Sequence, residues 1–272
     1  MKKIFSIIMI SLLSVAMLFT ACKKDENNNN NGNSETPGGG GTEVKPDGTI
    51  ENNVVTDIDG NVYNGVWLNG KLWMKENLRT THFADGSDIP TPSNETFSAI
   101  HPYRYAPNND ESNVPLYGYL YNWPAAVYGP VSGGVVKGAC PNGWHVPSTG
   151  EWEQMTEHLL QQEEYLCNGG LAAAMCATWA WEPMDDPHPC LPGTDLMSNN
   201  STGFTALPAG AITDNANMLP LGYNAMFWTS TPTGDGDSEI AWSRSIGYTY
   251  WHIGSSSSDY KGNGYSVRCV RD

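Results

Sequence analysis

The segment from Cys140 to Trp152 contains a cysteine, a tight turn and the start of the most regular helical pattern in the chain. Ser148 precedes Glu151 by three positions, which is the spacing of a capping box. In a capping box the hydroxyl and the carboxylate satisfy backbone N–H groups that the first helical turn leaves unpaired. We therefore expect a helix that begins near Thr149.

An apolar stripe follows this cap at steps of three and four residues. Its members are Trp152, Met155, Leu159 and Leu160. A stripe of this kind has to pack against another element of the fold. The segment is thus expected to pin the main helix to a sheet.

The N-terminal part of the chain has the pattern of an export signal. Residues 1–21 contain two lysines, an apolar run too short to cross a bilayer as a helix, and small residues before Cys22. Phe19-Thr20-Ala21-Cys22 resembles a bacterial lipoprotein cleavage box, so Cys22 is the expected lipidation site, the alternative being an ordinary secreted protein cut nearby. Residues 22–49, rich in Asn and Gly, are expected to form a disordered tether.

The net charge of −15 bears on the partners of the chain. Nucleic acid and anionic lipid surfaces attract positive proteins, so neither is an expected partner. Lys23-Lys24-Asp25-Glu26 looks like the export tag of surface lipoproteins in the Bacteroides group. We expect a protein held in the outer membrane by its N-terminal lipid and facing outward, with the periplasmic face as the alternative.

Five cysteines follow Cys22, and in an exported protein they indicate disulfides. Cys140 and Cys269 bracket the C-terminal half of the chain and are the preferred pair. Among the other three, Cys176 with Cys190 is the preferred pair, which leaves Cys167 as a thiol.

Runs of β-branched and aromatic residues alternate with Gly-containing turns near both ends of the expected domain, which is typical of β-meanders. The runs cover residues 54–58, 62–68 and 71–74, and later 227–231, 240–246, 248–253 and 264–270. A long loop is expected over residues 80–115. The pattern predicts an α+β domain over residues 50–272, with small twisted antiparallel sheets and one main helix.

Several segments together resemble the Fibrobacter succinogenes major paralogous domain. They are TDIDGNVYNGVWLNGKLWMKENLRTT, YGYLYNW, CPNGWHVPSTGEWEQM, GFTALPAG, FWTST, AWSRSI and GNGYSVRCVRD, in that order. The resemblance implies a fold related to C-type lectin-like domains and to formylglycine-generating enzymes. Residues 167–201 depart from the pattern, since they carry three extra cysteines and a proline-rich loop.

Signatures of catalysis are missing from the sequence: no GxSxG, GxxxxGK, GxGxxG or HExxH motif occurs. We expect no catalytic residue, no cofactor and no metal. Three groups of acidic or metal-ligating residue types have simpler interpretations as hairpin turns, solvated turns or a disulfide loop. These are Asp57 with Asp59 and Gly60, then Asp185, Asp186, His188 and Cys190, and then Asp235, Asp237 and Glu239.

Aromatic residues outside the expected core are the candidate ligand-binding residues, because sugar rings stack on such faces. They are Trp179, Trp181, Tyr248, Tyr250 and Trp251. We expect a surface-exposed lipoprotein that presents a non-catalytic binding or adhesion module for a glycan or a surface protein. The alternative is a structural subunit of a cell-surface assembly, with an enzyme as the third hypothesis.

Overall fold

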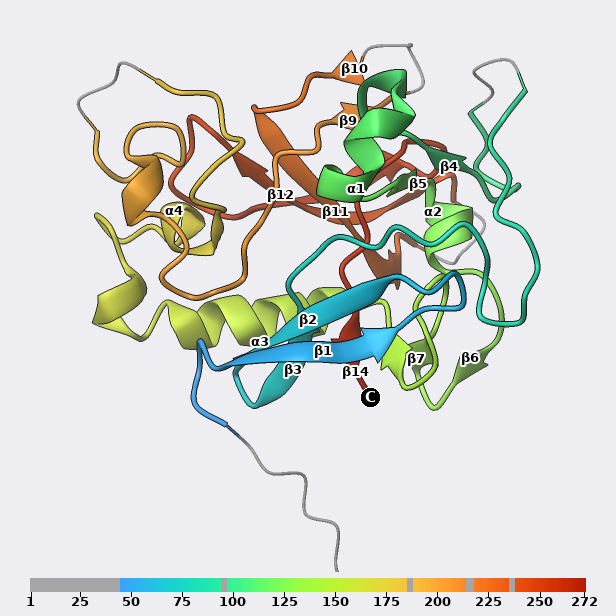
Figure 1. Cartoon of the computed structure of the whole chain (residues 1–272), viewed down its shortest axis with the longest axis horizontal. Helices are drawn as coiled ribbons and strands as arrows, with labels where there is room; N and C mark the ends of the chain where they lie inside the picture. Colours follow the sequence, from blue (N-terminus) through green and yellow to red (C-terminus); the bar gives the residue numbers. More distant parts are fainter. Residues whose placement is uncertain (1–44, 94–96, 185–187, 214–217, 235–237) are drawn as a thin grey trace, which may run out of the picture. The chain divides into compact units, whose positions relative to one another are not determined.

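The computed structural model describes residues 45–93, 97–184, 188–213, 218–234 and 238–272. The expectations for Cys22, for Asp185 and Asp186, and for Asp235 and Asp237 fall outside these residues. In the described part, small antiparallel sheets are combined with one main helix, α3 (Thr149–Leu159), as the sequence predicts for an α+β domain (Figure 1).

The largest sheet has the strand order β1-β2-β3-β14-β8. Its strands are β1 (Ile50–Thr56), β2 (Val62–Leu68), β3 (Lys71–Met74), β14 (Val270–Arg271) and β8 (Trp144–His145). All pairs in it are antiparallel. The C-terminal strand β14 lies between β3 and β8, so that Val270 pairs with Trp73 on one side and with His145 on the other. The first and last parts of the described domain are thereby joined.

A second sheet consists of β11 (Asn224–Pro232), β12 (Ile240–Gly247) and β13 (Gly254–Tyr260) in that order. The other strands and α-helices of the described residues are short. They are the paired strands β4 (Arg104–Tyr105) with β5 (Leu120–Tyr121), β6 (Val131–Ser132) with β7 (Val135–Val136), and β9 (Ala211–Ile212) with β10 (Met218–Leu219), and the helices α1 (Val114–Tyr117), α2 (Trp123–Ala126) and α4 (Ala172–Met175).

The predicted capping box starts α3. The Ser148 hydroxyl accepts the Glu151 N–H, and the Glu151 carboxylate accepts the Ser148 N–H at 2.9 Å. Trp152, Met155 and Leu159 are buried, and the Trp152 ring lies edge-on to Trp73 of β3, with ring centroids 5.2 Å apart. Leu160, expected in the same stripe, is instead exposed because the helix ends at Leu159.

Two of the expected C-terminal strands are wrong. Residues 248–253 form the connection between β12 and β13, and the Tyr250 N–H closes a turn on the Gly247 carbonyl. Residues 264–270 contain only the start of β14, because successive residues pair with different strands. The bridges join Gly264 to Ile212, Tyr265 to Tyr121 and Ser266 to Phe227.

The domain begins before residue 50, so the expected tether is too long at its C-terminal end. The Gly48 N–H donates to the Trp67 carbonyl at 2.9 Å, which adds this segment to the edge of β2. The Asp47 carboxylate accepts hydrogen bonds from His158 at 2.6 Å and Gln162 at 2.7 Å. Asp47 therefore fixes the chain to the C-terminal end of α3.

Two disulfides cross-link the described residues. Cys140 pairs with Cys269, as the sequence favours, across a sequence separation of 129 residues. The preferred pairing of Cys176 with Cys190 is wrong, because Cys190 bonds to Cys167 and Cys176 is a buried free thiol. Backbone pairing with Ala206 holds Cys176 in the core, whereas Cys167 has its Cα 5.2 Å from that of Cys190, within the range for a disulfide.

Arg268 is a buried cation in the centre of the domain. Its guanidinium donates to the Phe204 carbonyl at 2.6 Å and the Asn77 side-chain carbonyl at 2.8 Å, and lies over the Phe204 ring. Burial lowers the pKa of Arg268 to about 9. The side chain thus connects the last segment of the chain with the buried segment around Phe204.

Within the described ranges, no helix is both long enough and apolar enough to span a bilayer.

Candidate functional site

The five predicted ligand-binding aromatics do not form one surface. Trp181 is wrong as a ligand-binding residue, because it is buried in the core and its indole N–H donates to the Ala206 carbonyl at 3.2 Å. Tyr248 is half-buried with its ring edge against Tyr223. Trp179, Tyr250 and Trp251 are exposed to 40%, 69% and 38%.

The connection between β12 and β13 presents Tyr250, Trp251 and His252 side by side, and we call these three residues the aromatic platform. The Trp251 indole N–H donates to His252 Nε2 at 2.6 Å, which fixes the two rings at 71° to each other. Tyr250 and His252 border a hollow of about 270 Å³, together with Ser245. Aromatic faces thus stand next to hydroxyl and imidazole groups.

The platform is supported by the loop that the second disulfide closes. The Ala172 N–H at the start of α4 donates to the Trp251 carbonyl at 3.0 Å. Gly170 lies so close to Trp251 that a Cβ there would come within 2.3 Å of its carbonyl oxygen, so only glycine fits. The His188 ring, two residues before Cys190, has its centroid 6.2 Å from that of Trp251. Trp251 therefore lies against residues 167–201, the segment that carries the three extra cysteines.

A larger cleft lies near the β6–β7 hairpin. Its volume is about 510 Å³, and its walls come from residues 83–85, 128–130, 135, 137, 138 and 144 together with Asp272. The rings of Phe83 and Tyr128 are stacked with centroids 3.9 Å apart. We call this space the hairpin cleft. Sequence reasoning missed it because its walls come from segments far apart in the chain.

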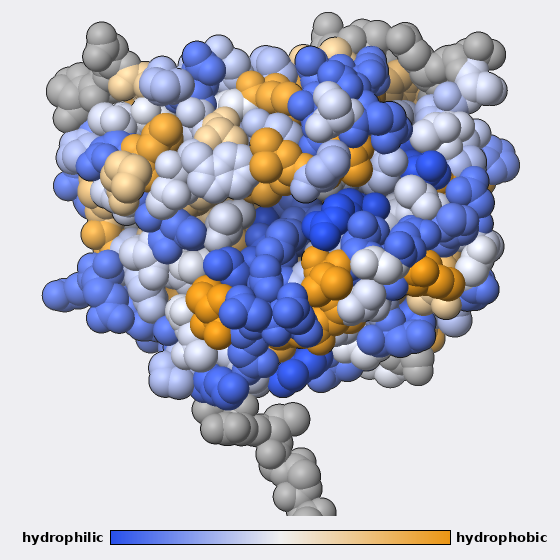
Figure 2. Space-filling model, viewed as in Figure 1, coloured by the Kyte–Doolittle hydropathy of each residue, from blue (hydrophilic) through white to orange (hydrophobic). Residues whose placement is uncertain are grey.

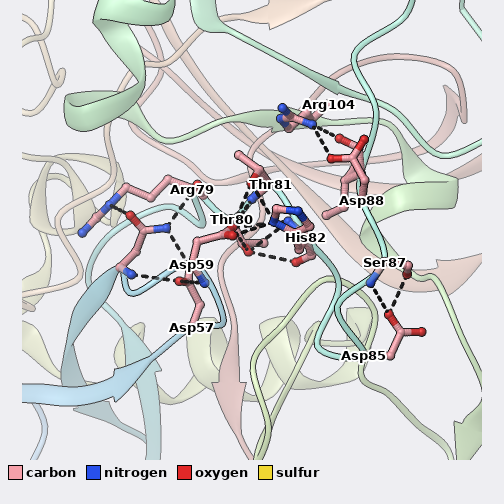
Figure 3. A network of polar contacts seen from close by, with 12 residues as sticks. Asp57, Asp59, Arg79, Thr80, Thr81, His82, Asp85, Ser87, Asp88 and Arg104 are labelled. Carbon is pink, nitrogen blue, oxygen red and sulfur yellow. Dashed lines mark hydrogen bonds and ion pairs between the residues drawn. The ribbon is translucent and has the colours of Figure 1, made fainter.

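A polar network fixes the segment that leads into Phe83 (Figure 3). The Asp59 carboxylate accepts hydrogen bonds from the Thr81 N–H at 2.5 Å and the Thr80 hydroxyl at 2.8 Å, and it contacts His82 Nδ1 at 2.6 Å. Burial alone would raise the pKa of Asp59, but these bonds outweigh it and lower the pKa to about 2. The turn after β1 therefore anchors residues 80–82.

Asp57 is satisfied by its own turn. Its carboxylate accepts the Asp59 N–H at 3.0 Å, the Asn61 N–H at 2.9 Å and the Tyr63 hydroxyl at 2.6 Å. These hydrogen bonds stabilise the hairpin turn between β1 and β2.

Over the described ranges, no group of three or more His, Cys, Asp or Glu side chains is arranged to hold a metal ion.

His145 lies between two carboxylates beside the hairpin cleft. Its Nε2 contacts Glu151 at 2.9 Å and its Nδ1 contacts Asp272 at 2.7 Å. Burial would lower the pKa of His145, but the two carboxylates outweigh it and raise the pKa. The cluster ties β8 to the start of α3 and to the end of the chain, and no local sequence pattern signals it.

The free thiol is not set up as a nucleophile. Cys176 is fully buried, and this burial raises its pKa well above the usual value. Reactive cysteines have a lowered pKa and are accessible, so Cys176 has the opposite properties.

The face of the molecule shown in Figure 2 is mostly hydrophilic, with small separate hydrophobic groups.

A family model described as the Fibrobacter succinogenes major domain matches residues 66–271. The match covers most of the chain, and the chain belongs to this family. No curated protein and no solved structure matches the chain.

Proposed function

We propose that this chain is a surface-exposed lipoprotein whose folded domain is a non-catalytic binding module, and that the aromatic platform binds glycans. The proposal includes a lipid on Cys22, an outer-membrane location and kinship of the fold with C-type lectin-like domains. The observation that carries it is the exposure of Tyr250 and Trp251 on a loop that is hydrogen-bonded to the segment closed by the Cys167–Cys190 disulfide.

The chemistry of the platform supports a sugar ligand. A pyranose ring has an apolar face that stacks on an aromatic side chain, and its hydroxyls need hydrogen-bonding partners nearby. Tyr250 supplies an open ring, while His252 and Ser245 supply polar groups on the adjacent hollow. The net charge of −15 favours a neutral glycan over an acidic one.

Anchoring the loop lowers the entropic cost of binding. A ligand that must order a mobile loop loses part of its binding energy to that ordering. Here the Ala172–Trp251 hydrogen bond and the close packing against Gly170 hold the platform before any ligand arrives. A small ring surface can therefore suffice for weak, reversible binding, which suits adhesion through many copies on one cell.

The test is a glycan array probed with the full-length protein and with Tyr250→Ala and Trp251→Ala. We expect the wild type to bind a defined set of neutral glycans, and each variant to lose at least about tenfold in affinity, or about 1.4 kcal/mol. Met197→Ala is the control, because Met197 is 83% exposed and does not line the hollow beside the platform. Equal binding by wild type and both variants would contradict the proposal.

Lipidation is tested separately. Metabolic labelling with a fatty acid should mark the wild type and leave Cys22→Ala unlabelled, and only the wild type should fractionate with the outer membrane. Protease accessibility on intact cells then distinguishes the outward face from the periplasmic face. An unlabelled wild type would contradict the lipid anchor while leaving the binding proposal intact.

A further inference from the structure

The hairpin cleft lies apart from the aromatic platform. In Figure 1, β6 and β7 lie at one end of the domain and α4, which contacts Trp251, lies at the other. A volume of about 510 Å³ falls in the range of ligand pockets, roughly 300–1,000 Å³. The cleft is thus large enough for a ligand of its own.

The aromatic wall of the cleft is already formed. Phe83 is buried, its N–H donates to the Ser87 carbonyl at 2.8 Å, and its ring supports that of Tyr128 at an interplanar angle of 19°. Tyr128 itself is 42% exposed. An exposed ring backed by a buried ring is a rigid stacking surface.

The floor behind this wall is close-packed. Gly138 has a φ of +58°, and a Cβ there would lie only 1.7 Å from the Ala126 carbonyl oxygen. Trp144 lines the cleft from β8 and is buried. Gly138 and Trp144 therefore give the cleft a close-packed floor.

Hydrogen-bond acceptors and a hydrogen-bond donor both line the cleft. The Asp85 carboxylate is held by the Ser87 N–H at 2.9 Å and by the Ser87 hydroxyl at 2.6 Å, both to Oδ1, and the Asp272 carboxylate contacts His145 through Oδ1. Each carboxylate has its Oδ2 outside these bonds as a further acceptor. Lys137, which bonds to Asn142, supplies an ammonium donor.

We propose that the hairpin cleft is a second binding site, which takes a neutral pyranose sugar with its apolar face on Tyr128. Hydroxyl groups both donate and accept hydrogen bonds, which matches a lining with carboxylate acceptors and an ammonium donor. Two carboxylates against one ammonium disfavour acidic sugars. This inference rests on the proposed function in that the module binds glycans, but it uses a different surface.

The experiment is saturation-transfer NMR with the full-length protein and a panel of methyl glycosides of neutral hexoses and N-acetylhexosamines, followed by titration. We expect binding in the millimolar range, on the order of 4 kcal/mol. Tyr128→Ala should weaken it at least about tenfold, since the stacking face is removed. Tyr128→Phe keeps that face and should bind as the wild type does, and Tyr250→Ala should have no effect on this site.

The other outcomes separate the two proposals. Binding that is lost in Tyr250→Ala and kept in Tyr128→Ala would overturn the cleft site and leave the platform. No binding of any methyl glycoside would overturn the cleft site, while the array with larger glycans still decides the proposed function. Binding of apolar aromatic compounds without sugars would overturn the ligand class.

Circular dichroism of Tyr128→Ala shows whether the variant is folded. If it is not, Asp85→Asn takes its place, with an expected several-fold loss of affinity for the glycoside.

Discussion

The two disulfide regions of the domain are held together in different ways. Cys140 and Cys269 lie next to β8 and β14, where sheet hydrogen bonds, the His145 cluster and the buried Arg268 also join the chain. Cys167 and Cys190 close a segment with little regular structure, which supports the aromatic platform. The first region is thus stabilised by many tertiary contacts, while the second depends more on its covalent bond.

Removing each disulfide tests this difference. The longer loop of the Cys140–Cys269 bond restricts the unfolded chain more, so Cys140→Ala with Cys269→Ala should lower the free energy of unfolding by about 5 kcal/mol on the chain-entropy model. The corresponding value for Cys167→Ala with Cys190→Ala is about 3 to 4 kcal/mol. Urea unfolding of both double variants measures the two losses. A loss well above about 5 kcal/mol for the Cys140–Cys269 pair would contradict the comparison, because it would show that the other contacts of the first region do not hold it without the bond.

Two tryptophans of the second region distinguish its core from its surface. Trp181→Ala should cost about 3 to 5 kcal/mol, because it leaves a cavity in the core. Trp179 is exposed, so Trp179→Ala should stay within about 0.5 kcal/mol of the wild type. Thermal unfolding of the two variants gives both values. Similar losses for both would show that the burial of Trp181 is misassigned.

The His145 cluster makes the first region sensitive to pH. A raised histidine pKa contributes stability that is fully present below the unfolded-state value near 6.5 and is lost as pH rises through the folded-state value. His145→Gln removes this contribution, so its destabilisation should be larger at about pH 5.5 than at about pH 8.5. Urea unfolding at the two pH values measures the difference. His101→Gln, on an exposed loop, is the control, and a pH-independent loss for His145→Gln would contradict the assignment.

Local signals made the first region predictable. The capping box gave the start of α3, and the turns Asp59-Gly60-Asn61 and Asn69-Gly70 gave the bounds of β2 and β3. These features depend on neighbours in sequence, and a short pattern contains them. The pairing of Cys140 with Cys269 was also favoured, because the two cysteines bracket the C-terminal half of the chain.

The second region was predicted poorly because tertiary contacts decide it. Cys176 pairs with Ala206 in the core, and Trp181 is buried with its indole N–H bonded to the carbonyl of the same residue. The pattern of aromatic and β-branched residues over 248–253 predicts a strand, yet these residues form the connection that contains the platform. Burial of Arg268 and assembly of the hairpin cleft from distant segments have no local signal either.

Hydrogen exchange of the full-length protein, with and without the strongest glycan from the array, tests the central claim most directly. Binding at the platform predicts that amides of residues 247–254 and 167–175 become protected when the glycan is added. Unchanged exchange in both segments, with the glycan bound, would contradict the claim.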